Sequence, residues 1–330
     1  MMRKNSFFGA ATAALAVMTL NAATAAPRYH PGMESCRSAE AAKRIDGCSQ
    51  VIEHLDQEPK HNKVVAYFNR GEAYETQGDH DRAIADFSKA LEIDAQSAQV
   101  LSARALAYKG KGDLDHALAD YDAAIKTDPK DVSAYLGRGG LYYAKGDHDR
   151  AIADFSQAVN VDPKYAPAYS ARAVIWRVRG DAEKALADLD QAVKLEKSGA
   201  AALVARGAFL QAKGDHDRAL ADLTAALARE PRSATAHNDR GLVYHSRGDL
   251  DHAIADFDAA IRLDPSLASA YVNRANAFRG KHEAERAKAD YEAALKLKPD
   301  LAAAQKGLQE VEKFLAHKAA APPPTQEQPR

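Results

Sequence analysis

The chain has 330 residues, of which 46% are hydrophobic, so it is long enough to bury a sizeable core. Its 45 Lys and Arg residues are balanced by 46 Asp and Glu residues, which gives a formal net charge of −1. This balance argues against a nucleic-acid partner, because phosphate binding needs a clustered excess of cations.

Residues 1–25 have the pattern of an export signal. Arg3 and Lys4 precede an apolar run of 14 residues (7–20), and the small-x-small motif Ala-Thr-Ala follows at 23–25. The apolar run is short for a membrane span, and no cysteine follows it at a lipidation position. We therefore expect cleavage at the end of this segment and an exported product, periplasmic or secreted, with no stable membrane span. An uncleaved anchor is the alternative.

The only two cysteines, Cys36 and Cys48, lie in the segment 26–63, between the signal and the repeats described below. An even number of cysteines in an exported chain favours a disulfide. An unstrained bridge over so short a loop adds about 2–3 kcal/mol to stability. Two buried thiols are the alternative, and the spacing of the pair is not a zinc pattern. Residues 36–53 look like a degenerate half-repeat, with Cys48 in place of the repeat aromatic.

From Val64 to Leu301 the chain repeats itself every 34 residues, without a single insertion or deletion. Repetition this strict predicts an array in which copies of one supersecondary unit stack on one another. A single copy cannot bury its own apolar face, so each copy needs its neighbours. The seven copies are 64–97, 98–131, 132–165, 166–199, 200–233, 234–267 and 268–301.

Each copy has two apolar faces at helical spacing, which predicts two amphipathic helices. A Gly-Asp pair, Gly78-Asp79 in the first copy, separates them. The glycine can end the first helix in the left-handed conformation, and the aspartate can cap the second. A proline such as Pro129 closes most copies. A small residue on the first helix, such as Gly71, leaves room for the aromatic side chain of the second, such as Phe87.

In the first copy the recurring aromatic and small positions are Tyr67, Gly71, Tyr74, Ala83, Phe87 and Ala90. With these residues the unit resembles the tetratricopeptide repeat (TPR), and the resemblance covers all seven copies. It is similar to exported bacterial members of that family. The resemblance implies an all-α fold: a right-handed α-solenoid of seven helix-turn-helix repeats, with an N-terminal half-repeat and a C-terminal capping helix.

Four positions depart from the repeat pattern. Ala95 and Lys197 replace the closing proline, His282 replaces the turn glycine, and His237 replaces an apolar residue of the first helix. These substitutions affect the edges of the copies in which they occur.

One arginine and one aspartate recur in every copy. The arginine precedes the small residue of the first helix, and the aspartate precedes the aromatic or leucine of the second. Because these positions meet in an antiparallel hairpin, we predict a structural ladder of ion pairs. The arginines are Arg70, Arg104, Arg138, Arg172, Arg206, Arg240 and Arg274, and the aspartates are Asp86, Asp120, Asp154, Asp188, Asp222, Asp256 and Asp290.

After the repeats, residues 302–318 are predicted to form a capping helix, with Leu308, Val311 and Leu315 on one face. Residues 319–330 are rich in proline and are predicted to be a disordered tail.

The sequence contains no phosphate-binding loop, nucleophile elbow or zinc-helix motif, so we expect no catalytic residue, cofactor or metal site. The resemblance instead implies a non-enzymatic interaction scaffold or adaptor of the bacterial periplasm. A peptide or a partner helix would bind in the concave groove, which the family lines with first-helix residues. The candidates are Phe68, Leu106, Leu136, Tyr143, Val174, Arg177, Leu242, His245 and Arg279.

Two alternatives remain open. One is an oligomeric structural element of the cell envelope. The other, which is weaker, is a metal-binding protein that uses the histidines of the inter-helix turns, such as His80, His148 and His216. Those turns are a repeat or more apart, whereas a metal site needs three or four converging ligands.

Overall fold

The computed structural model describes residues 32–320, which form seventeen α-helices, one short 3-10 helix and no strand. The predicted all-α solenoid of repeated hairpins is confirmed for this part of the chain. The expected signal, residues 1–25, lies outside the described residues. None of the helices within 32–320 combines the length and the apolar character needed to cross a membrane.

Two short helices and a 3-10 turn precede the repeats: α1 (Gly32–Cys36), α2 (Ala41–Glu53) and η1 (Leu55–Gln57). The first helices of the seven repeats are α3 (Lys60–Thr76), α5 (Ala98–Lys111), α7 (Val132–Lys145), α9 (Ala166–Val178), α11 (Ala201–Ala212), α13 (Ala234–Ser246) and α15 (Ala268–Gly280). The second helices are α4 (His80–Ile93), α6 (Leu114–Thr127), α8 (His148–Val161), α10 (Ala182–Leu195), α12 (His216–Arg229), α14 (Leu250–Leu263) and α16 (Ala284–Leu297). The last helix is α17 (Ala302–Ala320).

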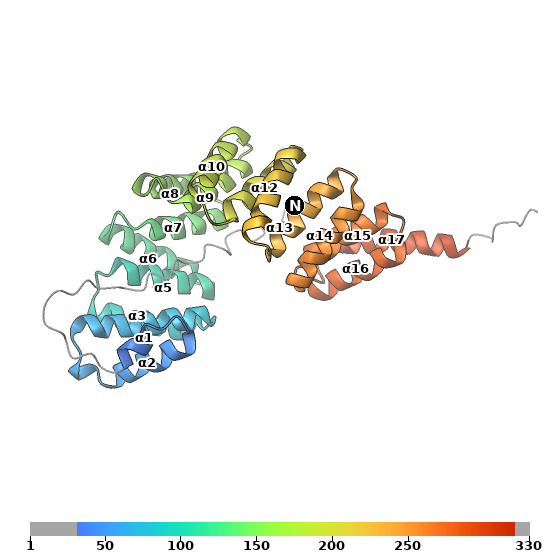
Figure 1. Ribbon diagram of the computed structural model, residues 1–330. Coiled ribbons are helices and arrows are strands. Elements are labelled where there is room, and N and C mark those ends of the chain that lie inside the picture. The colour runs from blue at the N-terminus through green and yellow to red at the C-terminus, as the bar shows by residue number, and fades with distance from the viewer. Residues whose placement is uncertain (1–31, 321–330) are drawn as a thin grey trace, which may run out of the picture. The chain divides into compact units, whose positions relative to one another are not determined.

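The chain divides into two compact units, with the boundary between Ala185 and Leu186, inside α10. Within each unit, consecutive helices from α1 to α9 and from α11 to α17 pack against one another along the chain, and successive first helices also contact one another. Figure 1 shows this order for α3, α5 and α7, which lie one after another. Each unit is therefore a stack of hairpins that buries its apolar faces between copies, as the repeat pattern predicts.

The inter-helix turns have the predicted chemistry. The six turn glycines, from Gly78 to Gly248, adopt positive φ angles between 76° and 86°. The aspartate after the glycine caps the second helix; the side chain of Asp79, for example, accepts from the backbone N–H of Arg82 at 3.1 Å. In the seventh repeat His282 takes the left-handed conformation itself, with φ 62°. Histidine tolerates this region less well than glycine, so the turn is kept at some cost in stability.

The small residues lie opposite the large ones, as predicted. A Cβ atom at Gly71 would lie 2.7 Å from Cε1 of Phe87, the second-helix aromatic of the same repeat. The structure adds a second match between neighbouring repeats: a Cβ atom at Gly137 would lie 2.1 Å from Cζ of Tyr121. Opposite Phe87, the equivalent residue of the next repeat is Ala103. A tyrosine at this position of the second helix therefore needs a glycine in the following repeat, whereas a phenylalanine leaves room for an alanine.

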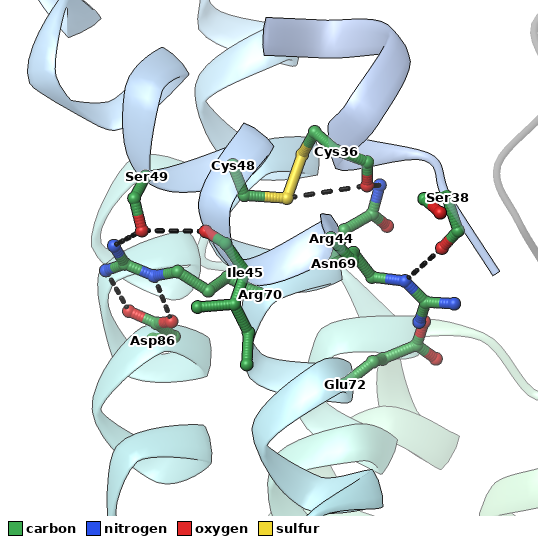
Figure 2. Close-up of a disulfide and its surroundings, with 10 residues drawn as sticks. All are labelled: Cys36, Ser38, Arg44, Ile45, Cys48, Ser49, Asn69, Arg70, Glu72 and Asp86. Atoms are coloured by element: carbon green, nitrogen blue, oxygen red, sulfur yellow. Dashed lines mark hydrogen bonds and ion pairs between the residues drawn. A yellow bond between two sulfur atoms is a disulfide. The ribbon is translucent and has the colours of Figure 1, made fainter. Parts of the chain in front are cut away.

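The N-terminal hairpin of α1 and α2 covers the start of the stack. Cys36 and Cys48 form a disulfide with an Sγ–Sγ distance of 2.04 Å, and both residues are fully buried. The carbonyl of Cys36 accepts from Nδ2 of Asn69 at 3.1 Å, which ties this hairpin to α3 (Figure 2). At Gly47 a Cβ atom would lie 2.5 Å from the backbone nitrogen of Cys36, so only glycine allows α1 and α2 to approach this closely.

Helix boundaries differ from the sequence prediction at two places. Helix α3 begins at Lys60, before the predicted start of the first repeat at Val64, so the end of the segment 26–63 is helical and continuous with the first repeat. Helix α17 runs to Ala320, two residues past the predicted end of the cap. Residues 319 and 320 are therefore helical and not part of a disordered tail; residues 321–330 lie outside the described part of the chain.

Candidate interaction surface

The Arg–Asp ladder is present as a series of two-bond ion pairs. Nε and Nη2 of Arg138 donate to the two carboxylate oxygens of Asp154 at 2.9 and 2.7 Å. The aspartates are buried, whereas the arginines keep about a fifth of their side-chain surface. Hydrogen bonds to a carboxylate stabilise the charged guanidinium, and this raises the pKa of Arg138. The prediction is confirmed for the six pairs that lie within one unit: Arg70–Asp86, Arg104–Asp120, Arg138–Asp154, Arg206–Asp222, Arg240–Asp256 and Arg274–Asp290. The members of the fourth pair, Arg172 and Asp188, belong to different units.

Most of these arginines make a third side-chain hydrogen bond, which the sequence analysis missed. Nη1 of Arg138 donates at 2.7 Å to Asp122, which lies on the second helix of the preceding repeat. The arginine therefore joins three helices, two of its own repeat and one of the repeat before it. The signal was a serine or an aspartate sixteen residues before the arginine, except in the first repeat, where Ser49 lies 21 residues before Arg70. The other third contacts are Arg70–Ser49, Arg104–Ser88, Arg172–Ser156, Arg206–Asp190 and Arg274–Asp258.

A second ladder joins neighbouring turns and was also missed. Lys111, at the end of one first helix, pairs at 2.7 Å with Asp81 of the preceding repeat. The first repeat has Gln77 at the position of this cation, and the hairpin before it has no acid at the position equivalent to Asp81. These pairs are largely exposed, so each contributes little to stability. The other pairs are Lys145–Asp115, Arg179–Asp149, Arg247–Asp217 and Lys281–Asp251.

Some of the turn histidines bind acidic side chains of their own repeats, whereas the buried Nδ1 atoms of His148 and His216 have no hydrogen-bond partner among the described residues. Nδ1 of His80 lies 2.8 Å from Glu75, and Nδ1 of His116 lies 2.8 Å from the capping Asp113. Within residues 32–320, no group of three His, Cys, Asp or Glu side chains is placed to hold a metal ion.

His237, one of the departures from the repeat pattern, occupies a polar site. Its Nδ1 lies 2.9 Å from Asp256, which also binds Arg240, and its Nε2 lies 3.2 Å from the carbonyl of Pro231. Tyr169 makes the equivalent contact in the fourth repeat, where its hydroxyl donates to the carbonyl of Pro163 at 3.1 Å.

The structure corrects one groove candidate. Phe68 is 1% exposed and its ring centroid lies 5.8 Å from that of Phe87, so it belongs to the core and lines no open surface. At this position of α3 the side chain turns toward α4 and α5, and a large aromatic residue is stabilised there by burial.

The remaining candidates of the first unit lie on neighbouring first helices. Leu106 on α5 is 40% exposed. On α7, Leu136 and Tyr143 are half-buried, because one side of each packs on the core cluster of α8 and α9. On α9, Val174 is half-buried and Arg177 is exposed. Residues 34 apart occupy the same position on successive copies, so these side chains form rows that cross the three helices.

Outside the two ladders, two groups on the first helices of this unit have shifted pKa values. Burial lowers the pKa of the Lys109 ammonium on α5, and no acidic side chain near it compensates. Burial likewise raises the pKa of Glu72 on α3, and Arg44, whose Nη1 lies 3.9 Å away, opposes the shift only in part.

The candidates of the second unit lie in a more polar setting. Leu242 and His245 on α13 are half-buried. Arg279 on α15 is already engaged: it donates to the hydroxyl of Tyr291 at 3.3 Å and pairs with Glu310 at 2.8 Å.

Amide and carboxyl groups add to this polar character. Nδ2 of Asn273 donates to Oδ1 of Asn238 at 2.9 Å. Next to Asn238, burial raises the pKa of Asp239 to about 6. Asp239 occupies the position that Gly137 has in the third repeat, where the packed structure has little room for a charged group.

Comparison with known proteins agrees with this geometry. The tetratricopeptide repeat family matches residues 64–97, 102–169, 141–202, 205–268 and 268–301. No curated protein sequence matches the chain.

Several solved structures have the same fold at low sequence identity. A tetratricopeptide repeat protein from Parabacteroides merdae is 18% identical, with a TM-score of 0.60, over 76% of this chain and 99% of its own. A chain of the APC/C hetero-tetramer Cut9–Hcn1 is 16% identical, with a TM-score of 0.64, over 83% of this chain and 53% of its own. Pseudomonas aeruginosa pilF is 18% identical, with a TM-score of 0.54, over 63% of this chain and 95% of its own. The family match over most of the chain, together with the 34-residue hairpins and the turn glycines, shows that the chain belongs to the tetratricopeptide repeat family.

Proposed function

We propose that this protein is a non-enzymatic scaffold or adaptor that binds a peptide or a partner helix of another protein along its first helices. The observation that carries the proposal is the surface of α5, α7 and α9. Leu106 is exposed there, and Arg177 and the half-buried Val174 lie close by. Apolar side chains edged by charge suit a peptide bound in a groove.

The rest of the molecule supports this proposal. Its recurring charged residues form structural pairs within and between repeats, so they serve the stack and not a reaction. A stack of hairpins held in this way is preorganised, and a flexible partner then meets a smaller ordering cost on the side of the protein. A structurally similar chain belongs to the Cut9–Hcn1 hetero-tetramer, an example of this fold in a protein assembly.

We further propose that the protein acts outside the cytoplasm, in a bacterial periplasm or as a secreted protein. The signal-like pattern of residues 1–25 supports this compartment. The disulfide between Cys36 and Cys48 supports it as well, because disulfides persist in oxidising compartments.

A photo-crosslinking experiment tests the interaction surface. A photoreactive amino acid is placed at Val174 on α9 in one variant and at Gln157, an exposed residue of α8, in the other. Both variants are expressed with the native leader and irradiated in cells. We expect discrete crosslinked proteins from position 174 and none of them from position 157. The same crosslinked bands from both positions, or none from either, would contradict the proposal.

A further inference from the structure

Three consecutive first helices of the first unit, α5, α7 and α9, share a pattern of side chains. One row of equivalent positions holds Leu106, Gly140 and Val174, and a second row, three residues further along each helix, holds Lys109, Tyr143 and Arg177. Residues three apart on a helix are neighbours on its surface, so the two rows lie side by side. We call these six residues the α5–α9 surface.

The middle of the first row is a narrow gap above Gly140, whose own atoms are buried by the residues around it. A Cβ atom at Gly140 would meet no atom within 4 Å, whereas a Cβ atom at the adjacent Gly139 would lie 2.7 Å from Cε1 of Phe155. Packing therefore requires glycine at 139 and not at 140. Glycine inside a helix lowers stability relative to alanine, so Gly140 has a cost that the folded chain alone does not explain.

Apolar side chains border this gap. Among the described residues, four large hydrophobic side chains are exposed: Leu106 and Val178 in the first unit, and Leu297 and Phe314 near the end of the second. Leu106 belongs to the same row as Gly140, and Val178 lies one turn beyond Val174 on α9. Two of the four thus flank α7, the helix that carries the gap.

The charge of these helices has one sign. Helices α5, α7 and α9 contain no aspartate or glutamate, whereas α6 and α8 between them carry the acids of both ladders. Lys109 lies among these helices, and its Nζ forms no ion pair with any residue in the described part of the chain. A partly buried ammonium without a carboxylate partner gains from an anionic group brought by a ligand.

We propose that the α5–α9 surface binds an acidic peptide segment with one apolar anchor residue. The anchor side chain enters the gap over Gly140, between Leu106 and Val174. Carboxylates that flank the anchor in the peptide pair with Lys109 and Arg177. This inference rests on the proposed function and adds to it the chemistry of the partner.

The test begins with a display library of random twelve-residue peptides selected on the full mature chain. The selected peptides are synthesised with a fluorophore, and their affinities are measured by fluorescence anisotropy. We expect the peptides to be enriched in Asp and Glu around a single Leu, Ile, Val or Phe, and to bind more weakly at higher salt.

Matched variants then locate the site. Gly140→Leu fills the gap, and Lys109→Glu reverses the charge; each is expected to weaken binding at least about tenfold. Lys126→Glu, an equal charge change at an exposed position of α6, is expected to change affinity by less than about twofold. Gly140→Ala controls for folding: its thermal midpoint should be no lower than that of the parent, while its affinity for the peptides falls.

The outcomes separate this inference from the proposed function. Selected peptides that are neutral or basic, or whose affinity does not respond to Gly140→Leu and Lys109→Glu, overturn the inference. If the same peptides lose affinity when Leu242 and His245 are changed to alanine, the protein still binds peptides, on the second unit. If no peptide is selected and position 174 gives no crosslink, both proposals fail.

Discussion

The N-terminal hairpin and the repeats behind it hold two antiparallel helices together by different chemistry. Six of the repeats use an arginine and a buried aspartate, such as Arg138 and Asp154, and Arg138 also reaches the preceding repeat. The hairpin of α1 and α2 uses the disulfide between Cys36 and Cys48. Immediately before Cys48 it has Gly47, where a repeat has the aspartate before its aromatic.

The difference follows from what each hairpin has on its two sides. A repeat has a copy before and after it, so a guanidinium with five donors can bind three helices at once. Among the described residues no hairpin precedes the first one, and its first helix has only five residues. A covalent bond holds so short a helix without a contact to a third helix. The C-terminal end is the opposite case, since α17 has Leu308 where the repeats have arginine, and within residues 32–320 no second helix follows it.

The largest expected effect comes from breaking the Arg–Asp ion pair of a central repeat. Asp154→Asn keeps the shape of the side chain but leaves Arg138 with one carboxylate instead of two. Because the carboxylate is buried and the guanidinium is partly exposed, we expect a loss of about 2–3 kcal/mol in the free energy of unfolding. Urea unfolding monitored by circular dichroism measures it.

Asp149→Asn is the matched control on the same helix. Asp149 is 82% exposed and pairs with Arg179 in the ladder of the turns, so we expect a change below about 0.5 kcal/mol. Equal losses for the two variants would show that the buried ladder does not stabilise the stack more than the exposed one.

Removal of the disulfide tests how the N-terminal hairpin is held together. The Cys36→Ser/Cys48→Ser double variant should lose about 2 kcal/mol, because the bridge no longer restricts the unfolded hairpin. Hydrogen exchange read by mass spectrometry should show faster exchange in residues 32–53 and little change beyond the second repeat, since repeats interact with their nearest neighbours. Faster exchange throughout the array would mean that the first hairpin governs the whole stack.

Asp239 is a partly buried acid that has no basic partner among the described residues, unlike the aspartates of the Arg–Asp ladder. The folded pKa of Asp239 is about 6, above the roughly 3.9 of an unfolded aspartate. The stability that its neutral form contributes is therefore present below about pH 4 and is lost as the pH rises through 6. Asp239 keeps some exposure, so we expect Asp239→Asn to stabilise the protein by about 1–2 kcal/mol at pH 7 and by little at pH 4.

Thermal unfolding of this variant and the parent at pH 4, 5, 6 and 7 gives the measurement. A stabilisation that does not depend on pH would rule out titration of Asp239 as its cause.

The smallest effect concerns the one turn that departs from the glycine pattern. His282→Gly should raise the free energy of unfolding by up to about 1 kcal/mol, because glycine adopts the left-handed conformation more readily than histidine does. Gly248→His places a histidine in the turn of the sixth repeat and should lower the free energy of unfolding by a similar amount. If neither variant changes the thermal midpoint, the turn does not limit the stability of its hairpin.

The sequence alone determined the features whose cause is local or strictly periodic. The Gly-Asp turns follow from the backbone preferences of two residues, and the six observed Arg–Asp pairs follow from two positions that recur every 34 residues. The packing of Gly71 against Phe87 was predictable for the same reason, because both residues belong to one hairpin.

The tertiary structure decided what depends on the distance between copies. Only the stacked helices show that Phe68 is core and that Arg138 also reaches Asp122. They also show that a Cβ atom has no room at Gly139, whereas at Gly140 it would meet no atom. Both positions are glycine, so the sequence alone does not distinguish them. Their environments differ because one faces the second helix of its own hairpin, whereas the other faces away from it, on the surface that we propose binds the partner.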